Sequence, residues 1–117
     1  MTYKPGTHII AALASTETHL LEKYASLRIF VDKLINTYEL VNLGEVYHNF
    51  EPQGFTAVIC LSESHMSFHT WPEYGRVNMD IYLSNYLRTN DETVMKMFLA
   101  IVDFFSATVI SQQTLTR

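Results

Sequence analysis

One stretch of the chain, from Leu61 to Gly75, concentrates side chains that can do chemistry. It holds serine hydroxyls, two imidazoles, two carboxylates and an indole. A serine hydroxyl is a poor nucleophile until a base or local strain activates it, and Ser64 directly follows the peptide carbonyl of Glu63. Histidine is the residue type that would act as the base, and the stretch contains His65 and His69. The stretch therefore favours nucleophilic chemistry at Ser64.

The same stretch alternates in the way of a β-strand. Successive side chains of a strand point to opposite faces of the sheet, so polar and apolar residues would separate onto different faces. The polar face carries His65, Ser67, His69 and Trp71, whereas the other face carries Met66, Phe68 and Thr70. Pro72 cannot donate to a strand ladder, so we expect the strand to end there.

Other kinds of site remain open on these residues alone. Glu63, His65, His69 and Glu73 are of types that bind zinc. Two histidines four residues apart on an extended strand lie about 13 Å apart, so one tetrahedral site would need a bend, and we expect no metal. A Ser/His hydrolase is a second option, but the chain lacks the Gly-x-Ser-x-Gly turn. The plainest alternative is a polar strand at a dimer interface.

The run from Glu63 to Gly75 resembles the self-cleavage and active-site segment of bacterial and archaeal S-adenosylmethionine decarboxylases. Members of that family cut their own chain at a Glu-Ser bond and convert the serine into a pyruvoyl cofactor. Weaker similarity extends from Gly6 over nearly the whole chain. The resemblance implies a single domain over residues 1–117 that is cut between residues 63 and 64.

The resemblance also implies how the cut would proceed. Ser64 would attack the carbonyl of Glu63, β-elimination of the ester would leave dehydroalanine, and hydrolysis of the dehydroalanine would leave a pyruvoyl group at position 64. His69 matches the processing histidine of the family, and Thr56 stands where the family has a second processing hydroxyl. Five residues of extended strand span about 16 Å, so we expect a turn that brings His69 towards Ser64.

Three further residues match the substrate-binding positions of the family. Phe50 and Trp71 correspond to aromatic residues that flank the adenine, and Glu73 corresponds to the carboxylate that holds the ribose hydroxyls. Aromatic rings can also attract a sulfonium centre through cation–π interaction. The pyruvoyl carbonyl reacts with a substrate amine and serves as the electron sink for loss of CO₂. The resemblance thus implies a small-molecule substrate, S-adenosylmethionine, in polyamine synthesis.

The chain departs from the family at two positions. Ser84 occupies the place of a cysteine that protonates the carbanion after decarboxylation. A thiol has a reference pKa of about 8.5, whereas an aliphatic alcohol is a far weaker acid. Ser84 could relay a proton from water, from Tyr82 or from Tyr86. Ala12 stands where many members have an acidic residue.

Three functions remain open because of these departures. The protein could decarboxylate S-adenosylmethionine with a different proton donor, decarboxylate another amino acid such as arginine or ornithine, or serve as a non-catalytic binding or regulatory subunit. Retention of Glu63 and Ser64, together with His69, Trp71 and Glu73, favours an enzyme. We therefore expect a self-processing decarboxylase of S-adenosylmethionine.

The length and composition predict one domain, and the sequence contains neither a basic cluster nor a long apolar run. The chain has 117 residues, 48% of them apolar, and a formal net charge of −4 with no basic cluster, which argues against nucleic-acid binding. There is no apolar run behind a basic amino terminus and no run as long as a membrane span, so we expect a cytoplasmic protein without a membrane partner. Cys60 is the single cysteine, which excludes an internal disulfide, and its apolar neighbours predict a small buried core residue.

Hydrophobic periodicity predicts the elements that must position these residues. Apolar residues at helical spacing predict amphipathic helices over about 26–38 and 91–105. Apolar runs, alternation and turn residues predict six strands, over 8–13, 43–50, 55–61, 65–71, 76–83 and 107–112. The order β-α-β-β-β-β-α-β predicts an α+β fold, a two-layer sandwich of an antiparallel sheet with two helices on one face. So short a chain leaves the other face bare, and the resemblance implies a homodimer with active sites near the subunit interface.

Overall fold

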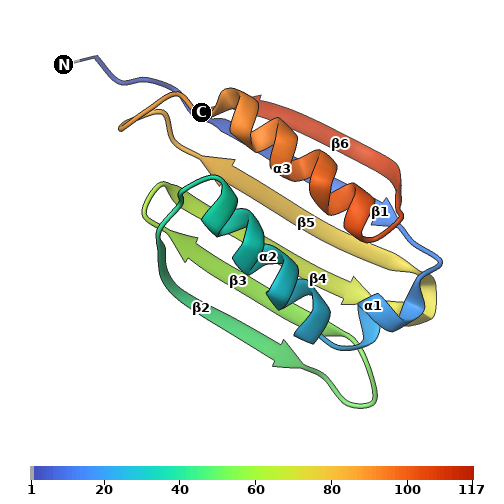
Figure 1. Cartoon of the computed structure of the whole chain (residues 1–117). Helices are drawn as coiled ribbons and strands as arrows, with labels where there is room; N and C mark the ends of the chain where they lie inside the picture. The colour runs from blue at the N-terminus through green and yellow to red at the C-terminus, as the bar shows by residue number, and fades with distance from the viewer. Residues whose placement is uncertain (1) are drawn as a thin grey trace.

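The chain folds into one six-stranded antiparallel sheet with its helices on one face (Figure 1), in a computed structural model that describes residues 2–117. The strands are β1 (Thr7–Ala14), β2 (Asn42–Asn49), β3 (Phe55–Leu61), β4 (Ser64–Trp71), β5 (Arg76–Leu83) and β6 (Thr108–Thr116). Their order across the sheet is β2-β3-β4-β5-β1-β6, and each neighbouring pair is antiparallel. The predicted fold class is confirmed.

The helices are α1 (Thr18–Glu22), α2 (Ala25–Thr37) and α3 (Asp91–Phe104), and a 3₁₀ turn, η1 (Pro72–Tyr74), follows β4. Helices α2 and α3 lie along the sheet on the side that faces the viewer in Figure 1. Each buries one apolar stripe, as the helical spacing predicted: Leu27, Val31, Leu34 and Ile35 on α2, and Val94, Met97, Phe98 and Ile101 on α3. The short helix α1 covers the end of β4, where Thr70 donates a hydrogen bond to the carbonyl oxygen of Leu21.

The last strand is longer than the sequence predicted. Strand β6 pairs with β1 from Thr108 opposite Ala14 to Thr116 opposite Thr7, with one register shift between Ala12 and Leu13. Every residue of β6 is exposed, so the strand lacks the buried, alternating apolar positions that reveal the other strands in the sequence. Backbone pairing with β1, and not burial of side chains, therefore determines where β6 ends.

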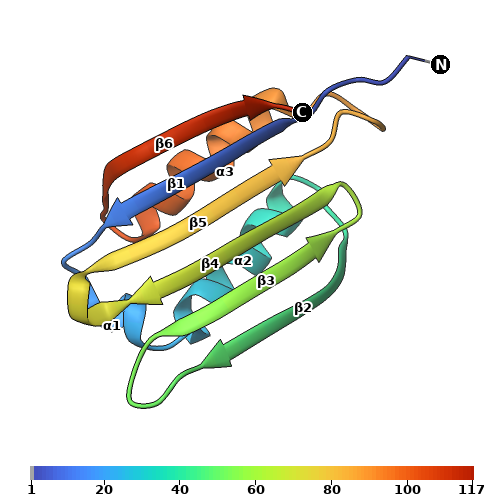
Figure 2. The ribbon, with the colours of Figure 1, turned by 180° about the vertical axis from the view of Figure 1, so that it is seen from behind.

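The face of the sheet opposite the helices is bare (Figure 2), and we refer to it as the open face. It exposes large apolar side chains together with the polar face of β4; the large apolar ones include Ile10, Val46, Val58 and Trp71. Cys60 also lies on this face and is exposed, so the prediction that it is buried was wrong. Its neighbours Ile59 and Leu61 point into the core, and strict alternation along β3 turns Cys60 outwards.

Among residues 2–117, no helix is both long and apolar enough to cross a membrane.

Candidate functional site

The peptide bond between Glu63 and Ser64 lies at the end of a tight hairpin. Strands β3 and β4 pair from Leu61 opposite Ser64, so Ser62 and Glu63 alone make the turn. Ser64 has a φ angle of +142°, a region that side chains of L-residues rarely adopt. Such strain persists only where the surrounding structure holds the residue in place, and it is concentrated at functional sites.

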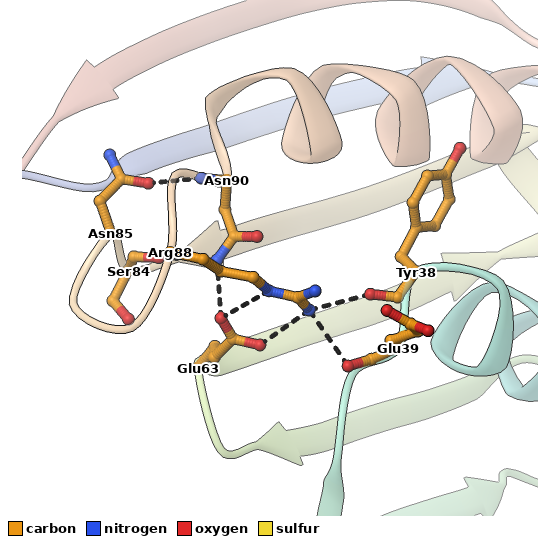
Figure 3. A network of polar contacts seen from close by, with 7 residues as sticks. All are labelled: Tyr38, Glu39, Glu63, Ser84, Asn85, Arg88 and Asn90. Carbon is orange, nitrogen blue, oxygen red and sulfur yellow. Dashed lines mark hydrogen bonds and ion pairs between the residues drawn. The ribbon is translucent and has the colours of Figure 1, made fainter.

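The Glu63 side chain is buried, with a relative exposure of 6%, and it is held by two residues of the loop before α3 (Figure 3). Arg88 donates two hydrogen bonds to its carboxylate, from Nε at 3.1 Å and from a terminal nitrogen at 3.0 Å. Asn90 Nδ2 donates a third at 2.9 Å. Burial raises the pKa of Glu63, but the hydrogen bonds from Arg88 and Asn90 and the charge of Arg88 outweigh it and lower the pKa below its usual value. Glu63 is therefore a carboxylate anion at neutral pH.

The main chain of the same loop holds the carbonyl of Glu63. The backbone N–H of Ser84 donates a hydrogen bond of 2.8 Å to the Glu63 carbonyl oxygen. The Ser84 carbonyl in turn accepts a 2.8 Å hydrogen bond from Asn90 Nδ2. The structure thus brings three predicted site residues, Glu63, Ser64 and Ser84, to one place. We refer to this place, with the adjoining Tyr82, as the cleavage half-site.

A second polar network crosses the centre of the sheet beside this half-site. Asp80 on β5 accepts hydrogen bonds from His8 Nε2 on β1 at 2.7 Å, from His65 Nε2 on β4 at 2.8 Å, and from the hydroxyl of Ser67. Burial raises the pKa of Asp80, but the three hydrogen bonds and the nearby His65 outweigh it and lower the pKa. Arg117 lies 3.2 Å from His8 Nδ1. Since a guanidinium group can only donate, Nδ1 of His8 is the acceptor of this contact, and Nε2 is the ring nitrogen that donates to Asp80.

Tyr82 lies next to this network and lines a pocket together with Ser64. It is the register partner of His8 on one side and of His65 on the other. A shallow pocket at this end of the open face is lined by Tyr3, Ser64, His65, Tyr82, Thr116 and Arg117. A hydrogen bond with Tyr3 and burial raise the pKa of Tyr82, so its phenol is protonated at neutral pH.

A metal ion is not needed to explain these contacts. Three side chains of metal-binding type have ligand atoms within 4.8 Å of one another: His8, His65 and Asp80. They are the only such group of histidine, cysteine, aspartate or glutamate in the part of the chain that the structure describes. Both imidazoles lie at hydrogen-bond distance from the same carboxylate oxygen of Asp80, so hydrogen bonds alone account for the cluster. The zinc ligands considered from the sequence do not gather, because Glu63 faces Arg88 and His69 contacts Thr56.

The remaining predicted residues lie at the other end of β3 and β4. Thr56 and His69 are register partners and share a hydrogen bond between the hydroxyl and Nδ1. The pocket beside them is lined by Phe50, Gln53, Phe55, Thr56, His69, Thr70, Trp71 and Glu73. We refer to Phe50, Thr56, His69, Trp71 and Glu73 as the aromatic half-site.

The predicted turn between Ser64 and His69 does not exist. Strand β4 runs without a break from Ser64 to Trp71. At about 3.3 Å per residue, Ser64 and His69 are roughly 16 Å apart along it. One chain therefore holds two half-sites at opposite ends of β4 and does not bring the predicted processing histidine to the predicted cleavage bond.

Sequence reasoning missed Arg88, Asn90 and the role of Asp80. The contact between Arg88 and Glu63 spans 25 residues, and that between His8 and Asp80 spans 72 residues. The loop from 84 to 90 has no hydrophobic period, so nothing in the sequence marks which of its polar residues turns inwards.

Comparison with known proteins agrees with the resemblance. The sequence model of a family described as S-adenosylmethionine decarboxylase matches residues 7–117. The S-adenosylmethionine decarboxylase proenzyme of Archaeoglobus fulgidus is 44% identical over 77 residues, which are 66% of this chain and 69% of that protein. The proenzyme of the same name from Thermoplasma acidophilum is 33% identical over 112 residues, which are 96% of this chain and 82% of that protein.

A solved structure has the same fold. The crystal structure of the adenosylmethionine decarboxylase from Aquifex aeolicus superposes with a TM-score of 0.86 at 24% sequence identity, covering 99% of this chain and 92% of the other.

Replacing Asp80 by asparagine should lower the free energy of unfolding at neutral pH by about 1–3 kcal/mol, because a charged acceptor of several hydrogen bonds is lost. The pKa of Asp80 is lower in the folded chain, so its contribution is fully present above the unfolded pKa of about 3.9 and is lost as pH falls through the folded value. Urea unfolding should thus show a wide gap between wild type and Asp80→Asn at neutral pH and a narrower one at about pH 3. Asp103→Asn, at an exposed position of α3, is the control and should change stability by less than about 0.5 kcal/mol. An equal gap at both pH values would contradict the assignment.

Proposed function

Because the chain belongs to the S-adenosylmethionine decarboxylase family, we propose that it is a self-processing, pyruvoyl-dependent carboxy-lyase. It converts S-adenosylmethionine to its decarboxylated form and CO₂, the reaction that supplies aminopropyl groups for polyamine synthesis. The observation that carries this proposal is the family match over residues 7–117, which includes the Glu63–Ser64 bond. The strain at Ser64 and the fixed carbonyl of Glu63 support it.

Self-cleavage begins at the cleavage half-site. The Ser64 hydroxyl oxygen attacks the Glu63 carbonyl carbon, the C–N bond breaks, and the hydroxyl proton passes to the freed amine. The Ser84 N–H lies where it can stabilise the charge that develops on the carbonyl oxygen. A base then removes the α-proton of residue 64, and the Cβ–O bond breaks to release Glu63 as a carboxylate. Water hydrolyses the remaining dehydroalanine, which releases ammonia and leaves a pyruvoyl group.

The base, His69, comes from a second copy of the chain. Within one chain His69 is roughly 16 Å from Ser64, too far to remove a proton from residue 64. The open face carries exposed apolar side chains, among them Val46, Val58 and Trp71, which a partner would cover. A two-fold pairing of two open faces would set the aromatic half-site of each copy against the cleavage half-site of the other. The active protein is therefore a homodimer with two composite sites.

The aromatic half-site binds the nucleoside part of the substrate. Phe50 and Trp71 are 48% and 41% exposed, so their rings are available to flank an adenine and to attract the sulfonium centre. Glu73 is exposed at the edge of the same pocket and accepts hydrogen bonds from the ribose hydroxyls. The pyruvoyl group at position 64 would supply the electron sink for loss of CO₂.

Tyr82 supplies the proton that completes the reaction, and Ser84 relays it. The pKa of Tyr82 is raised above the reference value of about 10, but a phenol is still a stronger acid than an aliphatic alcohol. Tyr82 lines the pocket of Ser64, and it also lines the neighbouring pocket with Ser84 and Tyr86. Tyr82 is therefore the acid that reaches both the reacting carbon and the position of the missing thiol.

The proposal is tested by the intact mass of the purified protein under denaturing conditions. We expect two fragments that divide after Glu63, the second with a blocked amino terminus, and a single full-length mass for Ser64→Ala. The processed protein should then release CO₂ from S-adenosylmethionine. Release from arginine or ornithine instead would support the alternative substrates, and a wild-type chain that stays whole after long incubation would overturn the enzyme assignment.

The composite site predicts complementation between two inactive chains. Ser64→Ala keeps His69 but cannot be cut, and His69→Ala keeps Ser64 but lacks the base. Each variant alone should stay whole or stop at the ester, whereas co-expression should yield cleaved His69→Ala chains in mixed dimers, detected by mass. If His69 acts within its own chain, the mixture will contain no more cleaved product than the separate variants.

The rate of decarboxylation in variants that are still cut should show whether Tyr82 is the proton donor and Ser84 only a relay. Tyr82→Phe removes the acid and should lower kcat about 10²–10⁴-fold while the chain is still cut, as measured by CO₂ release and intact mass. Ser84→Cys introduces a thiol with a pKa of about 8.5 and should restore activity to Tyr82→Phe. Unchanged kcat in Tyr82→Phe would exclude the phenol as proton donor.

A further inference from the structure

We propose that Arg88 and Asn90 are positioning residues for self-cleavage, acting as a clamp on the Glu63 side chain that holds the Glu63–Ser64 bond in its reactive conformation. The inference rests on the proposed function and adds to it two residues that touch neither the nucleophile nor the substrate. It also assigns a use to the loop between β5 and α3, which carries both residues.

The clamp is unusual because it buries a charged side chain at a hairpin turn. Turn residues are normally solvated, whereas Glu63 is 6% exposed and Asn90 is 1% exposed. Burial of a carboxylate is unfavourable unless it is paired and hydrogen-bonded, and here two residues supply all three donors. The carboxylate is thus held in one position, whereas a solvent-exposed turn residue would need no such donors.

Arg88 is itself fixed, so the clamp is rigid. The two hydrogens of one terminal guanidinium nitrogen are shared among three acceptors: the Glu63 carboxylate and the carbonyl oxygens of Tyr38 and Glu39, at 2.9 and 3.1 Å. These carbonyls follow the end of α2 (Figure 3). A planar guanidinium that binds a carboxylate with two parallel hydrogen bonds fixes its orientation as well as its distance. The clamp therefore connects the hairpin to the helix layer.

The clamp determines the geometry of the bond that is cut. On its carboxyl side, Ser64 is fixed by pairing with Leu61 and Leu83. On its amino side, Glu63 is fixed by its side chain in the clamp and by its carbonyl on the Ser84 N–H. These restraints together hold Ser64 at a φ of +142°. Without the clamp, the Glu63–Ser64 peptide can rotate towards a relaxed conformation, and the position of the carbonyl carbon relative to the Ser64 hydroxyl is no longer fixed.

After cleavage, the same contacts would join two separate fragments of the chain. Glu63 becomes the last residue of the fragment 1–63, while Arg88 and Asn90 belong to the fragment 64–117. The clamp then joins two chains and retains the new carboxyl terminus beside the site.

The rate of self-cleavage tests the clamp. Arg88→Ala should slow the appearance of fragments by about 100-fold or more, because small misplacements of reacting groups cost that much. Arg88→Lys keeps the charge but not the paired hydrogen bonds, so it should be intermediate. Arg28→Ala is the matched control: it breaks the 3.0 Å ion pair between Arg28 and Glu45, away from the hairpin, and should be cut at the wild-type rate. Fragments are quantified by intact mass during a time course after synthesis.

Hydroxylamine separates positioning from general loss of structure. It cleaves the ester that follows attack by Ser64, so it should release fragments from His69→Ala, which is blocked at elimination. It should release few or none from Arg88→Ala, which is blocked at the attack itself. Circular dichroism identifies any variant that fails to fold, and in that case Arg88→Lys decides the question.

The outcomes distinguish the two proposals. A folded Arg88→Ala or Arg88→Lys chain that is cut at the wild-type rate overturns the clamp and leaves the proposed function intact. A wild-type chain that is never cut overturns both.

Discussion

The continuity of strand β4 is the constraint on which the arrangement of the site depends. An extended strand cannot bring together two of its own residues that lie five positions apart. Ser64 and His69 are such a pair, on a strand without a bulge or break. Chemistry that needs both must therefore combine two copies of the strand, and the helix-free face of the sheet is where a second copy can approach. Secondary structure in this way imposes the quaternary arrangement of the proposed site.

A second constraint acts within the single chain and opposes relaxation of the hairpin. A backbone in an unfavourable φ region returns to a relaxed state unless it is restrained on both sides. Pairing within the sheet restrains Ser64 on one side, and the buried carboxylate of Glu63 restrains it on the other. The buried charge of Glu63, although unfavourable to desolvate, thus helps to fix the backbone conformation of Ser64. In the proposed mechanism, the first bond-forming step uses only groups of one chain, whereas proton removal would use a group of the partner.

The sequence predicted the two layers of the fold and the residues of the two half-sites better than the contacts that join distant segments. Helices α2 and α3 and the alternation of β4 follow from local periodicity, which short segments reveal by themselves. Cys60 was misplaced because an apolar run does not reveal which residues alternate outwards. The clamp residue Arg88 and the histidine partners of Asp80 were not found because their contacts join distant segments. Family resemblance supplied the predicted roles of Ser64 and His69 and led us to expect a turn between them, whereas the structure shows one unbroken strand.

The division of the site has a consequence for the order of events. The strained residue, the proposed nucleophile and the fixed carbonyl are all present in one folded chain, so in the proposed mechanism attack by Ser64 would not wait for a partner. Elimination does, because the proposed base lies on the far half-site. The ester can revert to the peptide, since the freed amine of residue 64 stays next to it. Only after pairing would elimination draw the equilibrium forward, and under the proposed mechanism the cofactor would therefore form where a complete substrate site exists.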